Sequence, residues 1–174
     1  KLILSLLVAA FVGGNTLSAQ TITKNEDGKY SLSVGHVTLT VDAQKGGKIV
    51  SYRYDDKEIL SQTKIPNSFG STFWTSPQSE WNWPPVPEYD TKPFNAEVAG
   101  DKLILTGEKS KRFGYRVRKE LTTDKKDNAI VITYTIINES GETRKVAPWE
   151  ISRVPNGGIL FFDAKEATPA NNMK

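Results

Sequence analysis

Three tryptophans fall within ten residues of a proline-rich segment: Trp74, Trp81 and Trp83. The segment, residues 61–93, holds six of the nine prolines in the chain and shows neither helical nor strand periodicity. Long irregular segments inside compact domains are usually functional or disordered, and disordered segments are poor in aromatic residues. The sequence therefore predicts an ordered loop that carries these rings.

The side chains of this loop suit one class of ligand. An indole ring offers a broad apolar face and a single N–H donor at its edge. Several such rings among Ser, Thr, Asn, Gln and Glu80 would fit a ligand that is apolar on one face and hydroxylated at its rim, as a sugar ring is. The alternative interpretation is that the rings simply fill one end of a β-sandwich, because large aromatic side chains are so often used in cores.

Two further candidates for the site lie near the end of the chain. Trp149 and Arg153 are four residues apart, so on a strand they share one face, while Glu150 and Ser152 point to the other. We predict that Trp149 and Arg153 lie beside the loop of residues 61–93, with Arg153 donating to ring hydroxyls or to a carboxylate. The alternative is that Trp149 belongs to the core and that Arg153 pairs with a nearby acid.

The sequence identifies no catalytic residues as clearly as it does candidate binding residues. Glu80, Glu88 and Asp90 could form a carboxylate pair for glycoside hydrolysis, but that reaction requires a separation of ~5–10 Å, which proximity in a loop does not fix. The catalytic residues are therefore unknown. No metal site is predicted, because the chain has one His, no Cys and no acidic residues at calcium-loop spacing. No cofactor is predicted either, because the phosphate-binding glycine-rich loops are missing.

The charge pattern excludes one class of partner. The chain has 23 cationic and 20 acidic side chains, a net charge of +3, and this mixture is typical of a solvated surface rather than a nucleic-acid interface. The densest basic stretch alternates as a strand does, with apolar residues on one face and arginines on the other. The apolar face is formed by Phe113, Tyr115, Val117 and Leu121, and the polar face by Arg112, Arg116 and Arg118.

The N-terminus has the pattern of a secretory signal peptide. Lys1 is followed by an apolar run, Leu2 to Val12, and then by small and polar residues up to Ala19. The run is too short for a membrane span, which needs about 20 apolar residues. We predict a signal peptide at residues 1–19, a mature start near Gln20, and a periplasmic or secreted location. The complete lack of cysteine favours a bacterial periplasm over a disulfide-stapled extracellular domain.

After position 20, short β-like runs alternate with turn signals, and no stretch is convincingly helical. This pattern predicts one all-β domain, an antiparallel β-sandwich. The last run, Ile159 to Phe162, is strongly apolar but only a polar tail follows it, so we expect residues 20–174 to be the N-terminal part of a truncated domain. The predicted strands cover residues 30–34, 36–42, 48–54, 58–60, 95–98, 103–106, 114–122, 129–138, 144–154 and 159–162.

The order of these segments resembles a known superfamily. Gly46 to Tyr52 and Val131 to Trp149 are similar to strands of the galactose mutarotase-like superfamily. Three further segments, Phe69 to Trp74, Ser79 to Pro85 and Ala147 to Val154, resemble an uncharacterised group of secreted bacterial proteins within it. The resemblance implies an antiparallel β-supersandwich that binds carbohydrate on its concave face, of which this chain would form the N-terminal part.

The catalytic pair of that superfamily does not carry over. The resemblance implies a Glu as general base and a His as general acid. Where mutarotases have a His on the returning strand, this chain reads Pro148–Trp149–Glu150. Its single histidine, His36, lies on an early predicted strand, and the expected Glu would lie beyond Lys174.

Three functions follow from these observations. The first is an exported carbohydrate-binding protein that takes a mono- or oligosaccharide at an aromatic concave face. The second is a carbohydrate-active enzyme of the aldose 1-epimerase type, with catalytic residues partly beyond the chain end. The third is a structural or protein-interaction β-sandwich, because exposed aromatic rings also mark protein interfaces.

Overall fold

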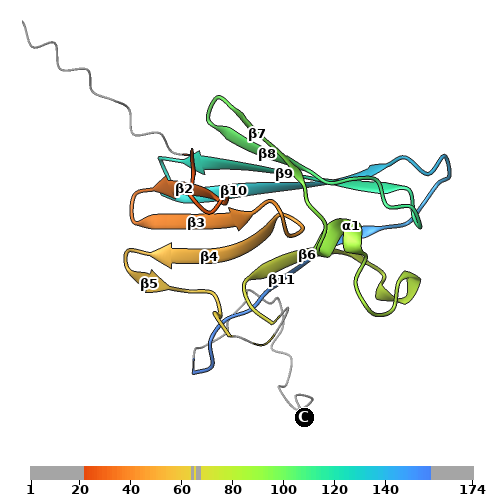
Figure 1. Cartoon of the computed structure of the whole chain (residues 1–174), viewed down its shortest axis with the longest axis horizontal. Coiled ribbons are helices and arrows are strands. Elements are labelled where there is room, and N and C mark those ends of the chain that lie inside the picture. The colour runs from red at the N-terminus through yellow and green to blue at the C-terminus, as the bar shows by residue number, and fades with distance from the viewer. Residues whose placement is uncertain (1–21, 64, 66–67, 158–174) are drawn as a thin grey trace, which may run out of the picture.

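Two antiparallel sheets packed face to face form the domain, in a computed structural model that describes residues 22–63, 65 and 68–157 (Figure 1). The larger sheet has the order β1-β2-β3-β4-β6-β11, with β5 paired to β4, and the smaller has the order β10-β9-β8-β7. This confirms the predicted all-β antiparallel sandwich. The predicted signal peptide and the apolar run 159–162 lie outside the described residues.

The strands are two to ten residues long and follow one another along the chain. The larger sheet consists of β1 (Ile22–Lys24), β2 (Tyr30–Val34), β3 (Val37–Asp42), β4 (Lys48–Tyr54), β5 (Lys57–Glu58), β6 (Ser71–Ser76) and β11 (Ala147–Ser152). The smaller sheet consists of β7 (Asn95–Ala99), β8 (Lys102–Thr106), β9 (Tyr115–Asp124) and β10 (Ala129–Asn138). Between β6 and β7 lie the short 3₁₀ helix η1 (Gln78–Glu80) and the single-turn helix α1 (Pro87–Asp90).

The core lies between the two sheets because each strand alternates apolar and polar residues. On β9, the predicted alternation is confirmed: Tyr115 and Val117 are fully buried, whereas Arg116 is half-buried on the outer face. Across the interface, Phe73 of β6 stacks on Tyr134 of β10, with ring centroids 4.6 Å apart. Each fully buried side chain of this size contributes about 1.5–3 kcal/mol through the hydrophobic effect.

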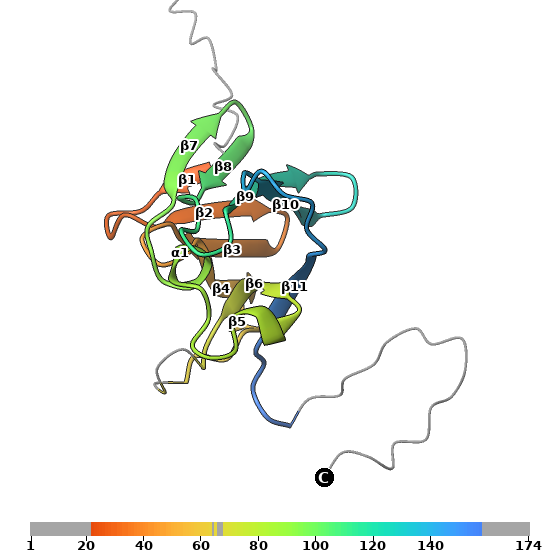
Figure 2. The ribbon, with the colours of Figure 1, turned by 90° about the vertical axis from the view of Figure 1, so that its right-hand side faces the viewer.

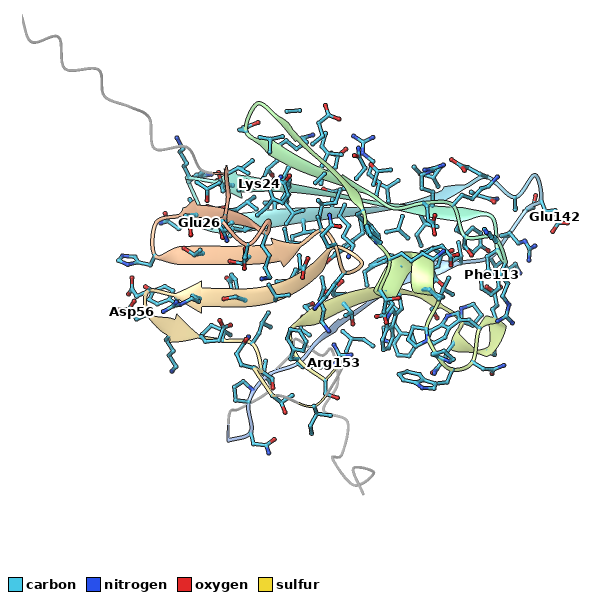
Figure 3. All side chains as sticks on the ribbon, viewed as in Figure 1. Lys24, Glu26, Asp56, Phe113, Glu142 and Arg153 are labelled. Atoms are coloured by element: carbon cyan, nitrogen blue, oxygen red, sulfur yellow. The ribbon has the colours of Figure 1, made fainter. Side chains whose placement is uncertain are left out.

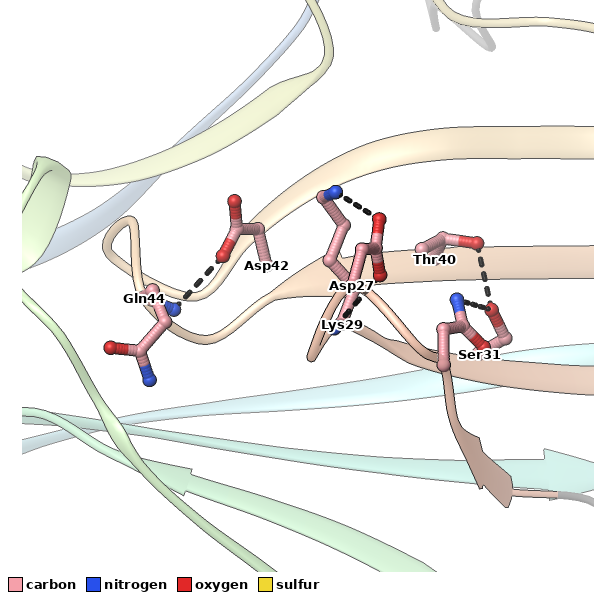
Figure 4. A network of polar contacts seen from close by, with 7 residues as sticks. Asp27, Lys29, Ser31, Thr40, Asp42 and Gln44 are labelled. Carbon is pink, nitrogen blue, oxygen red and sulfur yellow. Dashed lines mark hydrogen bonds and ion pairs between the residues drawn. The ribbon is translucent and has the colours of Figure 1, made fainter.

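The other face of β2 and β3 is polar. Cross-strand hydroxyl pairs run along it, with Ser31 Oγ 2.9 Å from Thr40 Oγ1 (Figure 4). At the end of β3, the Asp42 carboxylate accepts a hydrogen bond of 3.0 Å from the backbone N–H of Gln44 and so starts the turn into β4 (Figure 4). Asp42 thus fixes the start of the turn that contains Gly46 and leads into β4.

The structure corrects the prediction that residues 61–93 form one irregular loop. Ser71–Ser76 is strand β6, and the segment also contains η1 and α1. The alternation that marks a half-buried strand is missing because Ser71 to Thr75 are all buried, so both faces of β6 are covered. One face packs against the smaller sheet, and the other is covered by the segment of residues 77–94, which we call the tryptophan loop.

Figure 2 views the sandwich from the end near α1, where the tryptophan loop runs beside β6 and β11. Within the part of the chain that the structure describes, no helix has the length and apolar character needed to cross a membrane.

Candidate functional site

Four tryptophans meet where β6 and β11 pair. Trp74 of β6 lies directly opposite Trp149 of β11 in the antiparallel register. The Trp74 ring makes edge-to-face contacts with three others, at centroid distances of 5.7 Å to Trp149, 5.7 Å to Trp81 and 6.1 Å to Trp83. The structure therefore brings together all four tryptophans that the sequence singled out, with Trp74 at the centre.

The rings differ greatly in exposure. Trp74 and Trp81 are 7% and 4% exposed, Trp149 is half-buried, and Trp83 is 67% exposed. The two buried indoles have already used their donors: Trp74 Nε1 donates to Asp90 Oδ1 at 2.8 Å, and Trp81 Nε1 donates to the Thr75 carbonyl at 2.9 Å. Trp74 and Trp81 thus close the end of the sandwich, and Trp83 presents its ring to solvent.

The turn between β3 and β4 supports the tryptophan loop from behind. Gly46 N–H donates to the Lys92 carbonyl at 2.8 Å, and Phe94 N–H donates to the Ala43 carbonyl at 2.7 Å. A Cβ atom on Gly46 would lie only 2.4 Å from the Asp90 carbonyl oxygen, and the residue has a positive φ of 63°. Only glycine allows this close approach without a backbone shift.

A buried lysine fixes the same turn from the core side. Lys119 of β9 is 3% exposed, and its Nζ donates to the carbonyls of Gly46 and Gly47, both at 2.9 Å. The ammonium also lies 5.3 Å from the centre of the Phe94 ring. Burial lowers the pKa of Lys119 to about 8, against the opposing effect of Glu150 and Asp90. Sequence reasoning missed this residue, although its position places it on the same face of the strand as Tyr115 and Val117.

Two hollows adjoin the exposed ring. The first has a volume of about 360 Å³ and the second about 290 Å³, and they share Trp83, Pro84, Pro85 and Pro87. The remaining walls of the first are Trp81, Val86, Glu88, Lys111 and Arg112. Those of the second are Trp74, Asp90 and Thr91. Each hollow therefore combines aromatic and proline surface with a few hydrogen-bonding groups, as small-molecule sites do.

The polar groups of the first hollow are held in place by neighbours. Glu88 is 8% exposed and forms an ion pair of 3.1 Å with Lys92. Arg112 donates from Nη2 to the backbone carbonyl of Glu80 at 2.7 Å, and its guanidinium lies 4.8 Å from the centre of the Phe113 ring. Glu80 thus contributes its backbone to the site by orienting Arg112.

Arg153 occupies a different part of the cluster. It shares a face with Trp149 as predicted, and lies just beyond β11, where Figure 3 labels it. Its Nη1 donates to Thr72 Oγ1 at 3.2 Å, and its guanidinium lies 5.8 Å from the centre of the Trp74 ring. Burial, and then the nearby charge of Arg153, lower the pKa of Lys48. Among the described residues, Trp149 and Arg153 line neither hollow, and both contact the ring of Trp74 instead.

A third hollow of about 270 Å³ lies between the sheets. Half of its lining is apolar and continuous with the core: Leu39, Ile49, Leu60, Ile130 and Ile132. The other half carries hydroxyl or carboxylate groups: Tyr52, Ser71, Tyr134, Glu150 and Ser152. Glu150 and Ser152 are at its rim, on the face opposite Trp149 as predicted, and Ser71 Oγ donates to the Glu150 carboxylate. This hollow continues the hydrophobic core, and part of its polar lining is already paired, because Ser71 Oγ also lies 2.9 Å from Ser152 Oγ.

The single histidine is remote from the tryptophans. His36 lies in the turn between β2 and β3, not on a strand, and its Nδ1 is 2.7 Å from Asp55 Oδ1. Its ring stacks on that of Tyr54, with ring centroids 5.4 Å apart. Figure 3 labels Asp56, the neighbour of Asp55, at one end of the molecule and Phe113 at the other. Across the described ranges, no group of three or more His, Asp or Glu side chains could hold a metal ion.

The chain was compared with protein families, curated proteins and solved structures. No protein-family model matches the chain, and no curated protein matches it significantly. Among solved structures, the chain is similar to a 4-α-glucanotransferase from Thermococcus litoralis, with 15% sequence identity and a TM-score of 0.41. The alignment covers 66% of this chain and 23% of the glucanotransferase chain.

Proposed function

We propose that this protein binds carbohydrate at the two hollows beside Trp83. The observation that carries the proposal is the Trp83 ring, which is 67% exposed yet packs edge-on against Trp74 and forms part of both hollows. An exposed, oriented indole face is the surface on which the apolar face of a sugar ring stacks.

The surroundings of Trp83 suit such a ligand. Its proline neighbours and its contact with the buried Trp74 restrict the ring before binding, so little conformational entropy is lost when a ligand stacks on it. Asp90, Thr91 and Arg112 place acceptors and donors around the ring for sugar hydroxyls. Because the two hollows share Trp83, an oligosaccharide with one residue in each fits better than a single monosaccharide.

An enzyme of the aldose 1-epimerase type is the alternative function. It would need a general acid and a general base at the bound sugar. His36, the only histidine of the chain, lies in the β2–β3 turn, at the end of the molecule opposite the tryptophan loop (Figure 1). The described residues therefore favour a carbohydrate-binding protein over an epimerase. Membership of the galactose mutarotase-like superfamily, based on the sequence resemblance, is part of the proposal.

We also propose that the protein acts after export. The pattern of Leu2 to Ala19 is that of a cleaved signal peptide, which would place the mature protein in the periplasm or outside the cell.

Binding can be tested by titrating the protein with a panel of neutral and acidic oligosaccharides, while tryptophan fluorescence and heat are measured. A saturable change in fluorescence with at least one saccharide supports the proposal. The exposed Trp83 is the indole whose surroundings a stacked sugar would change most, because it is the most exposed of the four. A flat response to the whole panel, together with capture of a protein partner that Trp83→Ala abolishes, would assign the ring to a protein interface instead.

A further inference from the structure

We propose that the bound carbohydrate is acidic, with a carboxylate or sulfate group placed beside Lys111 and Arg112. This inference rests on the proposed function and specifies its ligand. Both cations are exposed and both line the first hollow, the one that also contains Trp81 and Trp83.

The charge of this hollow is positive on balance. Glu88 is the one carboxylate in the lining that the structure describes, and it is 8% exposed. Its partner Lys92, at 3.1 Å, is shared with Glu108, so these three side chains together carry one negative charge. Lys111 and Arg112 bring two positive charges to the wall against the single carboxylate of Glu88, which leaves one net positive charge for an incoming anion. Glu108, whose pKa is lowered by Lys92 and then by Lys111, lies outside the lining.

Arg112 is held in a position from which it can donate to an anion. Its Nη2 donates to the Glu80 carbonyl at 2.7 Å, and the guanidinium plane is steadied by the Phe113 ring at 4.8 Å. A guanidinium has five N–H donors, so this one contact leaves several available for a carboxylate or sulfate. The cation is therefore oriented before the ligand arrives.

The turn that carries both cations is itself fixed in the core. Ser110 is fully buried, and its Oγ accepts a hydrogen bond of 3.3 Å from the Phe113 N–H. Its carbonyl accepts one of 2.9 Å from the Gly114 N–H. Phe113 is buried beside Tyr115, with ring centroids 6.2 Å apart. Lys111 and Arg112 thus extend from a rigid turn, as a binding site requires.

The second hollow has the opposite character. It contains Asp90 and Thr91 and no cationic side chain among the described residues. A carboxylate accepts hydrogen bonds from hydroxyls but repels an anion. We therefore expect the acidic sugar residue in the first hollow and the hydroxyls of the next residue in the second, with Trp83 between them.

The test compares two ligand pairs that differ only in charge: an oligogalacturonate with its methyl ester, and a sulfated tetrasaccharide with its desulfated form. Binding to the full chain is measured by calorimetry, at low and high salt. We expect one anionic member to bind at least about tenfold more tightly than its neutral partner, because charge-assisted hydrogen bonds are lost in the neutral form. High salt should reduce this preference.

Three variants locate the preference. The double variant Lys111→Gln with Arg112→Gln should remove it, while Lys125→Gln, which deletes an exposed charge in the distant β9–β10 turn, should leave it intact. Trp83→Ala should weaken binding of the anionic ligand by about tenfold, and melting curves should show that each variant is folded.

Each outcome decides a separate point. Equal binding of anionic and neutral partners, or a preference that survives the double variant, would overturn the acidic ligand and leave the carbohydrate site standing. If the Trp83→Ala variant binds the anionic ligand as tightly as the unchanged protein does, the site is a general polyanion-binding surface, and the inference is overturned. If neither these pairs nor any saccharide of the wider panel binds, the proposed function itself fails.

Discussion

The indole Nε1 of Trp74 donates a hydrogen bond of 2.8 Å to Asp90 Oδ1 and thereby joins strand β6 to helix α1. Both residues line the second hollow beside Trp83. Replacing Asp90 with Ala leaves a buried N–H without its acceptor, which should cost about 1–3 kcal/mol of unfolding free energy. Asp90→Asn keeps an acceptor oxygen and should cost less. Denaturant unfolding of the two variants measures the difference, and equal losses would contradict this role.

Gly46 is predicted to tolerate no side chain. At Gly46 an added Cβ would lie 2.4 Å from the Asp90 carbonyl oxygen, whereas at Gly100, with a nearly identical φ of 64°, it would meet nothing within 4 Å. Both Gly→Ala variants suffer the strain of a positive φ, about 1–2 kcal/mol. Only Gly46→Ala should add a clash, so its melting temperature should fall clearly below that of Gly100→Ala. Matching melting temperatures would show that the turn yields without cost.

Lys119 should make stability depend on pH in the alkaline range. Burial lowers its pKa in the folded state from 10.5 to about 8, so between these values the unfolded chain binds more protons. The free energy of unfolding therefore rises with pH across this window, by on the order of 3 kcal/mol in total. Below about pH 8 the folded protein bears the full cost of burying a charged lysine. Lys119→Met should lack this rise.

The pH effect is measured by urea unfolding at several pH values, with Lys125→Met as the control for a lost exposed charge. Because other lysines and tyrosines also titrate in this range, the difference between the two variants is the relevant quantity. A Lys119→Met variant whose stability rises with pH as steeply as the control would contradict the assignment.

Export predicts a defined mature N-terminus. If residues 1–19 are a signal peptide, mass spectrometry of the protein recovered from the periplasm or medium should find a chain that starts near Gln20. An uncleaved chain recovered from the cytosol would count against the proposed location.

The sandwich could be predicted from the sequence wherever a strand buries only one face. β2, β4 and β10 match the expected ranges, and in β2 and β10 the alternation of inward and outward residues marks a half-buried strand. β6 was missed because both of its faces are buried, one by the smaller sheet and one by the tryptophan loop, so Ser71–Ser76 has no alternation. β11 is shorter than expected and begins at Ala147.

The site was predicted in part. That the tryptophans gather could be expected from their spacing, but which ring is exposed depends on long-range contacts. Trp74 is buried because α1 places Asp90 against it, a contact that no local pattern reveals. Arg112 was assigned to the polar face of a strand, yet it precedes β9 and lines the first hollow. A turn residue of this kind is positioned by tertiary packing rather than by strand periodicity.

The most direct test of the account compares Trp83→Ala with Trp81→Ala, using oligosaccharide titration and thermal unfolding on each variant. Trp83 is 67% exposed and Trp81 is 4% exposed, so only the first can be removed without opening the core. We predict that Trp83→Ala weakens saccharide binding about tenfold with a nearly unchanged melting temperature, whereas Trp81→Ala costs ~3–5 kcal/mol of stability. Full saccharide affinity in a folded Trp83→Ala variant would contradict the proposed binding site.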